Sequence, residues 1–407
     1  MPKQILKFPA GFLWGASTSA YQIEGGIIND WSEWEKSEAR TKKLKIEGKN
    51  PEDYICGQAG DSYNRYEEDF DLVKNLNCGA YRMGIEWSRI EPNQGEFNFD
   101  EILHYRQVLR AAKARNLKIV LTLWHWTNPL WFAETGGWSN QEAVKHYLRY
   151  VELAVKELGD NVDYWVILNE PMVHLANGYL IGKFPPNKKN IWLAKRACDN
   201  LIKAHKAAYE IIHEKFPQAM AGLTMLTNFF EPARKGNPLE IIFSKLANYF
   251  WNDRFVKKLK NKYDFLGLDY YFHDRVIWRP PFVKNKNEKI TDMGWEIYPR
   301  GLEQVLKDYG KFKKPLFIME NGLADAADDR RADFIIEHLK YAHKAIKDGI
   351  DVRGYFYWSL LDNFEWAEGY WPKFGLYSVD RKTFKRTARP SAKVYAEICK
   401  NNEVMIN

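Results

Sequence analysis

Short runs of four to six mostly apolar residues recur along the chain, separated by longer stretches with the apolar spacing of helices. Because successive positions in these runs are apolar, they predict parallel strands that are buried on both faces. We expect eight strands, over residues 12–16, 80–85, 118–123, 164–168, 221–224, 265–268, 316–319 and 354–357. Between them we expect helices, for example over 101–115, 141–158, 192–215 and 331–348. Eight strand–helix units without a Pro/Ser/Gly-rich linker predict one (β/α)8 barrel domain over residues 1–407.

Polar and aromatic residues gather where the predicted strands end. In a barrel of parallel strands, the carboxyl ends meet at one rim, and active sites form there. The residues in question are Gln22 and Glu24, Arg82, Trp124 to Trp126, Asn169 and Glu170, Asp269 to Tyr271, Glu320, Trp358, and Asp362 to Trp366. This convergence predicts one polar, aromatic site at the rim.

Two glutamates end core strands in the same way. Glu170 follows an apolar run and precedes Pro171, and Glu320 follows another apolar run and precedes Asn321. Paired carboxyl groups on opposite sides of a scissile bond are what a two-carboxylate glycosidase needs. Each glutamate taken alone is equally consistent with a cap of the following helix, but two in such similar settings favour catalysis.

Composition narrows the class of protein. Of the 407 residues, 15% are aromatic, including 16 tryptophans, many beside acidic residues and glycines, as expected where flat rings face sugars. The net charge of +7 lies in lysine patches that suit solvated helix faces, and no nucleic-acid-binding module accompanies it. The sequence has no apolar run of about 20 residues, so no membrane span is expected.

The cysteines and the first residues predict a location. Cys56, Cys78, Cys198 and Cys399 are scattered, without metal-ligand spacing, and the start of the chain lacks the pattern of a secretory signal. We therefore expect reduced thiols in a cytoplasmic protein that needs no cofactor and no metal.

Motifs spread over nearly the whole chain resemble glycoside hydrolase family 1, the β-glucosidase and β-galactosidase family. They lie at residues 8–25, 81–82, 87–90, 169–171, 320–322, 358–366 and 374–376. The resemblance implies that Glu170 is the general acid/base and Glu320 the nucleophile of a retaining mechanism. It further implies that Arg82 steadies the nucleophile, Tyr271 touches it, and Asn169 binds the sugar 2-hydroxyl.

The resemblance also implies a sugar-binding set, which comprises Gln22, His125, Trp126, Trp295, Trp358, Glu365, Trp366 and Phe374. Within it, Trp358 corresponds to the floor of the sugar pocket and Trp295 to the platform of the leaving-group site. For His125 alone, a satisfied core histidine is the default alternative, but its place between Trp124 and Trp126 favours sugar contact.

The chain departs from the family pattern at several places. Residues 228–262 hold little beyond one helix, which implies a more open leaving-group side. Asp269 stands where family members usually have asparagine. If Asp269 is ionised near the catalytic pair, it should keep Glu170 protonated to higher pH; alternatively, His273 or Arg275 pairs with it.

We therefore expect a retaining β-glycosidase that hydrolyses terminal β-D-glucosides, with side activity on β-galactosides or β-fucosides. Its partner is a small β-glycoside or short oligosaccharide. A 6-phospho-β-glycosidase is a weaker alternative, because Glu365 and Trp366 replace the phosphate ligands of such enzymes. An inactive sugar-binding member of the same fold would have lost a carboxylate. The sequence leaves the aglycone and the oligomeric state open.

Overall fold

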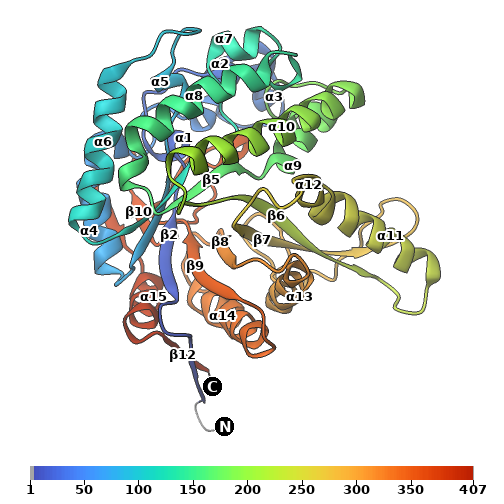
Figure 1. The fold of residues 1–407 in the computed structure, drawn as a ribbon. Coiled ribbons are helices and arrows are strands. Elements are labelled where there is room, and N and C mark those ends of the chain that lie inside the picture. The colour runs from blue at the N-terminus through green and yellow to red at the C-terminus, as the bar shows by residue number, and fades with distance from the viewer. Residues whose placement is uncertain (1–3, 407) are drawn as a thin grey trace.

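A computed structural model describes residues 4–406, and eight parallel strands form a closed barrel at its centre (Figure 1). Each strand pairs with the next one along the chain, and β9 closes the barrel by pairing with β2. The strands are β2 (Leu13–Ser17), β3 (Ala80–Gly84), β4 (Lys118–Thr122), β5 (Tyr164–Asn169), β6 (Met220–Pro232), β7 (Phe265–Val276), β8 (Leu316–Asn321) and β9 (Val352–Trp358). The predicted (β/α)8 barrel is confirmed, and each of its strands overlaps a predicted run.

Apolar side chains fill the inside of the barrel. They come from six of the strands and are Ala80, Val120, Val166, Phe265, Phe317, Met319 and Phe356. The side chains that point outward from the same strands join a second, larger core beneath the helices. Both faces of each strand are therefore buried, which explains the continuous apolar runs. Since the interior is packed, a binding site can form only at an end of the barrel.

The helices surround this barrel, and four of them match the predicted ranges closely. They are α1 (Ala20–Ile23), α2 (Asp30–Lys36), α3 (Glu38–Ile46), α4 (Ser62–Asn75), α5 (Trp87–Ile90), α6 (Phe99–Ala114), α7 (Leu130–Glu134), α8 (Ala143–Leu158), α9 (Pro171–His174), α10 (Ile191–Lys215), α11 (Pro238–Asn248), α12 (Arg254–Lys258), α13 (Pro299–Gly310), α14 (Arg331–Lys347) and α15 (Pro390–Asn401). Helix α6 starts two residues earlier than predicted, because Asn98 caps it by accepting hydrogen bonds from the backbone of Asp100 and Glu101.

Strands β6 and β7 are much longer than the sequence predicts. The predicted strands end at residues 224 and 268, whereas the pairing continues to Pro232 and Val276. The extension carries polar residues, which hid it in the sequence. It is stabilised by ion pairs, for example from Arg275 to Glu231 at 3.3 Å and to Glu296 at 2.9 Å. In Figure 1 the two strands extend from the barrel toward α11.

Both ends of the chain lie together at one side of the barrel (Figure 1). Strand β1 (Gln4–Lys7) pairs antiparallel with β12 (Glu403–Ile406), and β10 (Tyr377–Val379) pairs with β11 (Arg386–Ala388). Within residues 4–406, no helix has the length and apolar character needed to cross a membrane. The interpretation of the chain as one domain stays a prediction.

Irregular strand pairing occurs at the carboxyl ends of three strands that carry candidate site residues. The register shifts between Val166 and Asn169 on β5, between Leu268 and Asp269 on β7, and between Ile318 and Asn321 on β8. Bulges of this kind redirect the side chains next to them. Because the three strands are parallel, Asn169, Asp269 and Glu320 lie at the same end of the barrel.

Candidate active site

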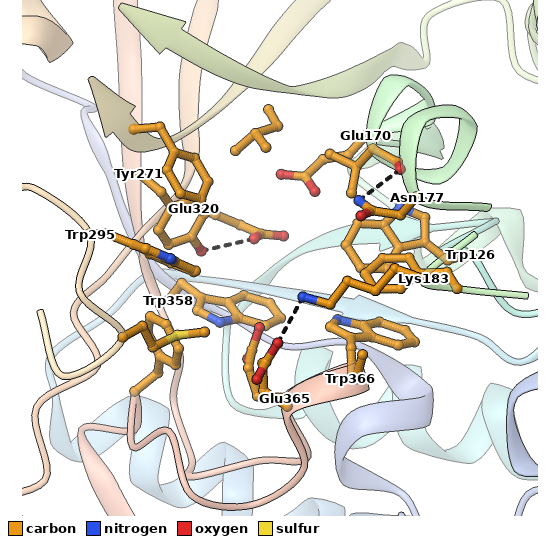
Figure 2. Close-up of a pocket in the computed structure, with 18 of the residues that line it drawn as sticks. Trp126, Glu170, Asn177, Lys183, Tyr271, Trp295, Glu320, Trp358, Glu365 and Trp366 are labelled. Carbon is orange, nitrogen blue, oxygen red and sulfur yellow. Dashed lines mark hydrogen bonds and ion pairs between the residues drawn. The ribbon is translucent and has the colours of Figure 1, made fainter. Parts of the chain in front are cut away.

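A pocket of about 480 Å³ opens at the carboxyl ends of the strands (Figure 2). Its volume lies within the range of small-molecule sites. The tryptophans and the phenylalanine of the predicted sugar-binding set all line it, which are Trp126, Trp295, Trp358, Trp366 and Phe374. The rings pack on one another, with centroids 4.7 Å apart for Trp126 and Trp366 and 6.2 Å apart for Trp295 and Phe374. Flat apolar walls of this kind suit the faces of sugar rings.

The carboxyl groups of Glu170 and Glu320 project into the same part of the pocket (Figure 2). Each side chain is buried, and one oxygen of each, together with one of Asp269, lies within 4.8 Å of the others. Glu170 adopts a left-handed backbone with φ of 42°, as do Trp126 at 74° and Trp366 at 51°. Such conformations are unfavourable for residues with a side chain and concentrate at functional sites.

Arg82 and Tyr271 hold the carboxyl group of Glu320. The fully buried guanidinium of Arg82 donates one hydrogen bond to Glu320 and another to the side-chain oxygen of Asn169. The hydroxyl of Tyr271 donates to the second oxygen of Glu320 over 3.0 Å. Burial raises the pKa of Glu320, whereas Arg82 and Tyr271 act in the opposite direction. Of the three neighbouring carboxyl groups, Glu320 is therefore the one best suited to carry a negative charge.

Hydrogen bonds fix the orientation of Asn169 and the tautomer of His125. The amide oxygen of Asn169 accepts from Arg82 and, over 2.5 Å, from Thr224, so its NH₂ group faces Nε2 of His125 at 2.9 Å. His125 must then accept at Nε2 and carry its proton on Nδ1. Burial, aided by Arg82, lowers the pKa of His125 well below its ordinary value, so the ring is neutral. Its buried Nδ1–H has no hydrogen-bond partner among residues 4–406.

The surroundings of Glu170 favour its protonated form. Burial raises the pKa of Glu170 well above its ordinary value, and the negative charges of Asp269 and Glu320 raise it further. Its Oε1 is buried and has no hydrogen-bond partner within the described residues. Glu170 and Glu320 thus lie side by side in different surroundings: Arg82 and Tyr271 bind Glu320 and favour its ionised form, whereas the charges of Asp269 and Glu320 favour the protonated form of Glu170. This difference is what a general acid and a nucleophile require.

Glu365 lies at the side of the pocket that is closed by Trp366. Burial raises the pKa of Glu365 to about 8, with further contributions from Glu320 and Glu368. Lys183 opposes this rise in pKa and forms an ion pair with Glu368 at 2.7 Å. One oxygen of Glu365 is buried without a partner in the part of the chain that the structure describes. That oxygen can accept hydrogen bonds from the hydroxyls of a sugar.

Comparison with known proteins identifies the family. The sequence profile named glycosyl hydrolase family 1 matches residues 4–257 and 249–404. The chain belongs to glycosyl hydrolase family 1. β-Glucosidase A of Thermotoga maritima is 33% identical over 448 aligned positions, which cover 98% of this chain and 99% of that protein. The β-galactosidase of Pyrococcus woesei is 29% identical over 98% of both. A solved β-glycosidase structure from Pyrococcus horikoshii, 37% identical, superimposes with a TM-score of 0.89 over 98% of this chain and 96% of that one.

Most of the residues predicted for this family 1 hydrolase reach the pocket surface, but three lie behind it. Arg82 and Asn169 form a supporting layer beneath Glu320 and His125. Gln22 is fully buried, and its amide accepts from Ser19 over 2.6 Å and donates to the backbone of Phe364 over 2.8 Å. In the hydrolase, Gln22 therefore lies next to Glu365 and does not line the pocket.

Several residues that line the pocket of the hydrolase were not predicted from its sequence. They include Leu226 and Asn228 on the extension of β6, Trp251 in the helical segment before α12, and Asn177, Lys183, Glu368 and Trp371 at other edges. Leu226 and Asn228 were missed because β6 was predicted to end at residue 224, and Trp251 because residues 228–262 resemble a loop and one helix.

The cluster of Glu170, Asp269 and Glu320 is also the one group of side chains, within residues 4–406, close enough together to share a metal ion. Arg82 already supplies a positive charge to this cluster through its contact with Glu320. With Arg82 beside them, these three carboxyl groups are therefore better suited to hold a proton than to bind a divalent cation.

Proposed function

We propose that this family 1 hydrolase removes terminal sugars from β-D-glucosides by a retaining double displacement through Glu320 and Glu170. The observation that carries the proposal is the short distance between the two carboxyl groups, at most 4.8 Å between their nearest ligand oxygens. Retaining glycosidases hold their two carboxyl groups about 5–5.5 Å apart, whereas inverting ones leave about 6.5–9.5 Å for a water molecule.

In the first step, the ionised carboxylate of Glu320 attacks the anomeric carbon. Arg82 and Tyr271 keep Glu320 ionised and aim its oxygens. As the glycosidic bond breaks, Glu170 passes its proton to the departing oxygen. A covalent glycosyl-enzyme results, in which Glu320 carries no charge.

In the second step, Glu170 acts as a base. The loss of the Glu320 charge lowers the pKa of Glu170, which has just given up its proton. Glu170 takes a proton from water while the water attacks the anomeric carbon, and the bond to Glu320 breaks. The product keeps the configuration of the substrate because the carbon has been inverted twice.

The sugar-binding groups favour a glucoside. Glu365 and His125 offer an acceptor and a donor for hydroxyl groups beside the rings of Trp366 and Trp358. The names of the relatives, β-glucosidase and β-galactosidase, support glucosides as the main substrates and galactosides or fucosides as secondary ones. The neighbouring carboxyl groups of Glu365 and Glu368 make a 6-phosphorylated sugar a poorer ligand.

Replacement of the nucleophile tests the proposal. In Glu320→Ala no group is left to form the covalent bond, so hydrolysis of nitrophenyl β-glucoside should fall by at least about a thousandfold. Added azide should restore turnover and give the α-configured glycosyl azide. The matched variant Glu337→Ala, on the surface of α14, should keep normal activity. Near-normal activity of Glu320→Ala would refute the assignment.

We also infer a cytoplasmic location, which rests on the four cysteines. All four are free thiols, and three of them are buried. The sulfur atoms of Cys78 and Cys399 lie 3.8 Å apart, at hydrogen-bond distance and without a disulfide between them. Cell fractionation with a thiol-reactive label checks this, because labelled, reduced thiols in the soluble fraction are the expected result.

A further inference from the structure

A third carboxyl group lies beneath the catalytic pair. Asp269, on β7, is directly opposite Glu320 of β8 in the strand register, and the side chain is fully buried. Like charges at such directly opposed positions repel each other. Neither oxygen of Asp269 has a hydrogen-bond partner within residues 4–406. A buried carboxylate without a donor is costly, so the surroundings of Asp269 need an explanation.

The potential partners of Asp269 are engaged elsewhere. Arg82, on β3, directs one NH₂ group to Glu320 and the other to Asn169. Thr224, on β6, gives its hydroxyl proton to Asn169. His273 and Arg275, the two cations that the sequence suggested as partners, bind Glu296 at 2.6 Å and 2.9 Å instead.

The remaining groups around Asp269 do not supply a donor either. His125 of β4 is neutral and binds Asn169, while Tyr271 of β7 donates to Glu320. Tyr309 of α13, on the outer side, gives its hydroxyl proton to the backbone of Asn252. What is left within reach is the carboxyl group of Glu170 on β5, whose own Oε1 is also unpartnered.

We propose that Asp269 shares the catalytic proton with Glu170, so that the two carboxyl groups act as one acid–base unit. Asp269 is then a positioning residue, since it holds the proton on Glu170 without touching the substrate. The proposal rests on the assignment of Glu170 as the general acid. In support, burial and the charge of Asp269 together raise the pKa of Glu170. Burial also raises the pKa of Asp269 well above its ordinary value.

The charge of the site stays constant through the first step. Before reaction, Glu320 carries one negative charge and the Glu170–Asp269 unit carries another, together with one proton. When Glu320 bonds to the anomeric carbon, its charge disappears, and the unit gives its proton to the leaving oxygen. Two negative charges then lie on the unit beside Arg82, the same number as before. The doubly ionised unit is a stronger base than Glu170 alone, so it takes the proton of the attacking water readily.

Asp269→Asn tests the proposal through the pH profile. The substitution removes the charge and keeps the shape of the side chain. The alkaline limb of kcat/KM reports the general acid of the free enzyme. Without the neighbouring negative charge, Glu170 should lose its proton more easily, and the limb should move to lower pH by about 1–2 units.

The control is Asp264→Asn, which makes the same chemical change at the opposite end of β7, where Asp264 binds Tyr209 over 2.8 Å. This control should leave the limb in place. If Asp269→Asn does not fold, Asp269→Ser removes the same charge and should give the same shift. An unmoved limb in the Asp269 variants, or an equal shift in Asp264→Asn, would overturn the proposal.

Glu170→Gln separates this proposal from the one on which it rests. With substrates that have poor leaving groups, the alkaline limb should vanish in Glu170→Gln if Glu170 is the acid. If it vanishes there and stays unmoved in Asp269→Asn, only the sharing of the proton is wrong. If the limb persists in Glu170→Gln, the assignment of the acid itself is wrong.

Discussion

Tyr271→Phe removes a single hydrogen bond from the nucleophile. The hydroxyl of Tyr271 donates to Oε2 of Glu320 over 3.0 Å, while Arg82 binds the other oxygen. Burial raises the pKa of Tyr271 well above its ordinary value, so it stays a donor throughout the working pH range. The phenylalanine ring keeps the packing against Trp295, whose centroid is 6.0 Å away. The variant therefore changes the electrostatics of Glu320 and little else.

The size of the effect follows from the charge on the acceptor. A hydrogen bond to a charged group contributes roughly 1.5–3 kcal/mol. One pKa unit corresponds to about 1.36 kcal/mol, so loss of the bond should raise the pKa of Glu320 by about 1–2 units. Glu320 must be ionised to attack, and activity is lost as the pH falls through its pKa. The acid limb of kcat/KM should therefore move to higher pH by about 1–2 units, with roughly a 10- to 100-fold loss below it.

Tyr270→Phe provides a matched control on the same strand. Tyr270 points away from the pocket, and its hydroxyl donates to the backbone oxygen of Tyr298 over 2.8 Å. Its loss should lower the free energy of unfolding by about 1 kcal/mol and leave the acid limb in place. The profiles are measured with nitrophenyl β-glucoside at substrate concentrations far below KM. An acid limb that stays put in Tyr271→Phe, or that shifts equally in Tyr270→Phe, would show that the bond does not tune Glu320.

Three further predictions concern other parts of the molecule. Glu170→Ala should slow substrates with poor leaving groups far more than activated aryl glycosides, for which burst kinetics should reveal an accumulated glycosyl-enzyme; equal losses would contradict the assignment. Since burial raises the pKa of Glu365 to about 8 and its ionised form accepts sugar hydroxyls, KM for a β-glucoside should fall as the pH rises through 8, and Glu365→Gln should abolish that dependence. Arg331, fully buried, donates to the backbone oxygens of Asp325, Lys373 and Gly375, so Arg331→Met should lower the free energy of unfolding by about 3–5 kcal/mol in urea titrations; a loss below about 1 kcal/mol would contradict this.

The barrel could be predicted because burial on both faces of a parallel strand leaves a continuous apolar run. The same physical rule explains the failure at β6 and β7, whose outer halves are stabilised by the charges of Glu231, Arg275 and Glu296. Polar residues in a strand give no apolar signal, and their ion-pair partners lie on other segments. The residues that this extension brings to the pocket, such as Asn228, were missed for that reason.

The site could be predicted for those residues whose position at the end of a buried strand is enough to bring them into the pocket. Glu170 and Glu320 reach the pocket because the strand before each one is buried. Gln22 has a comparable position in the sequence, yet it lies behind the surface, because Ser19 and the backbone of Phe364 bind its amide. The pairing of Lys183 with Glu368 joins residues 185 positions apart, and no local pattern indicates such a contact.

The contact between Arg82 and Glu320 spans 238 residues of sequence. A loop of that length closes slowly, and the contact forms late unless the intervening strands have already paired. In a partly folded chain, both charges are solvated and the arginine has no effect on the glutamate. Recovery of enzyme activity during refolding should therefore lag behind the recovery of helical structure. The time course of activity then reports when the β-barrel closes.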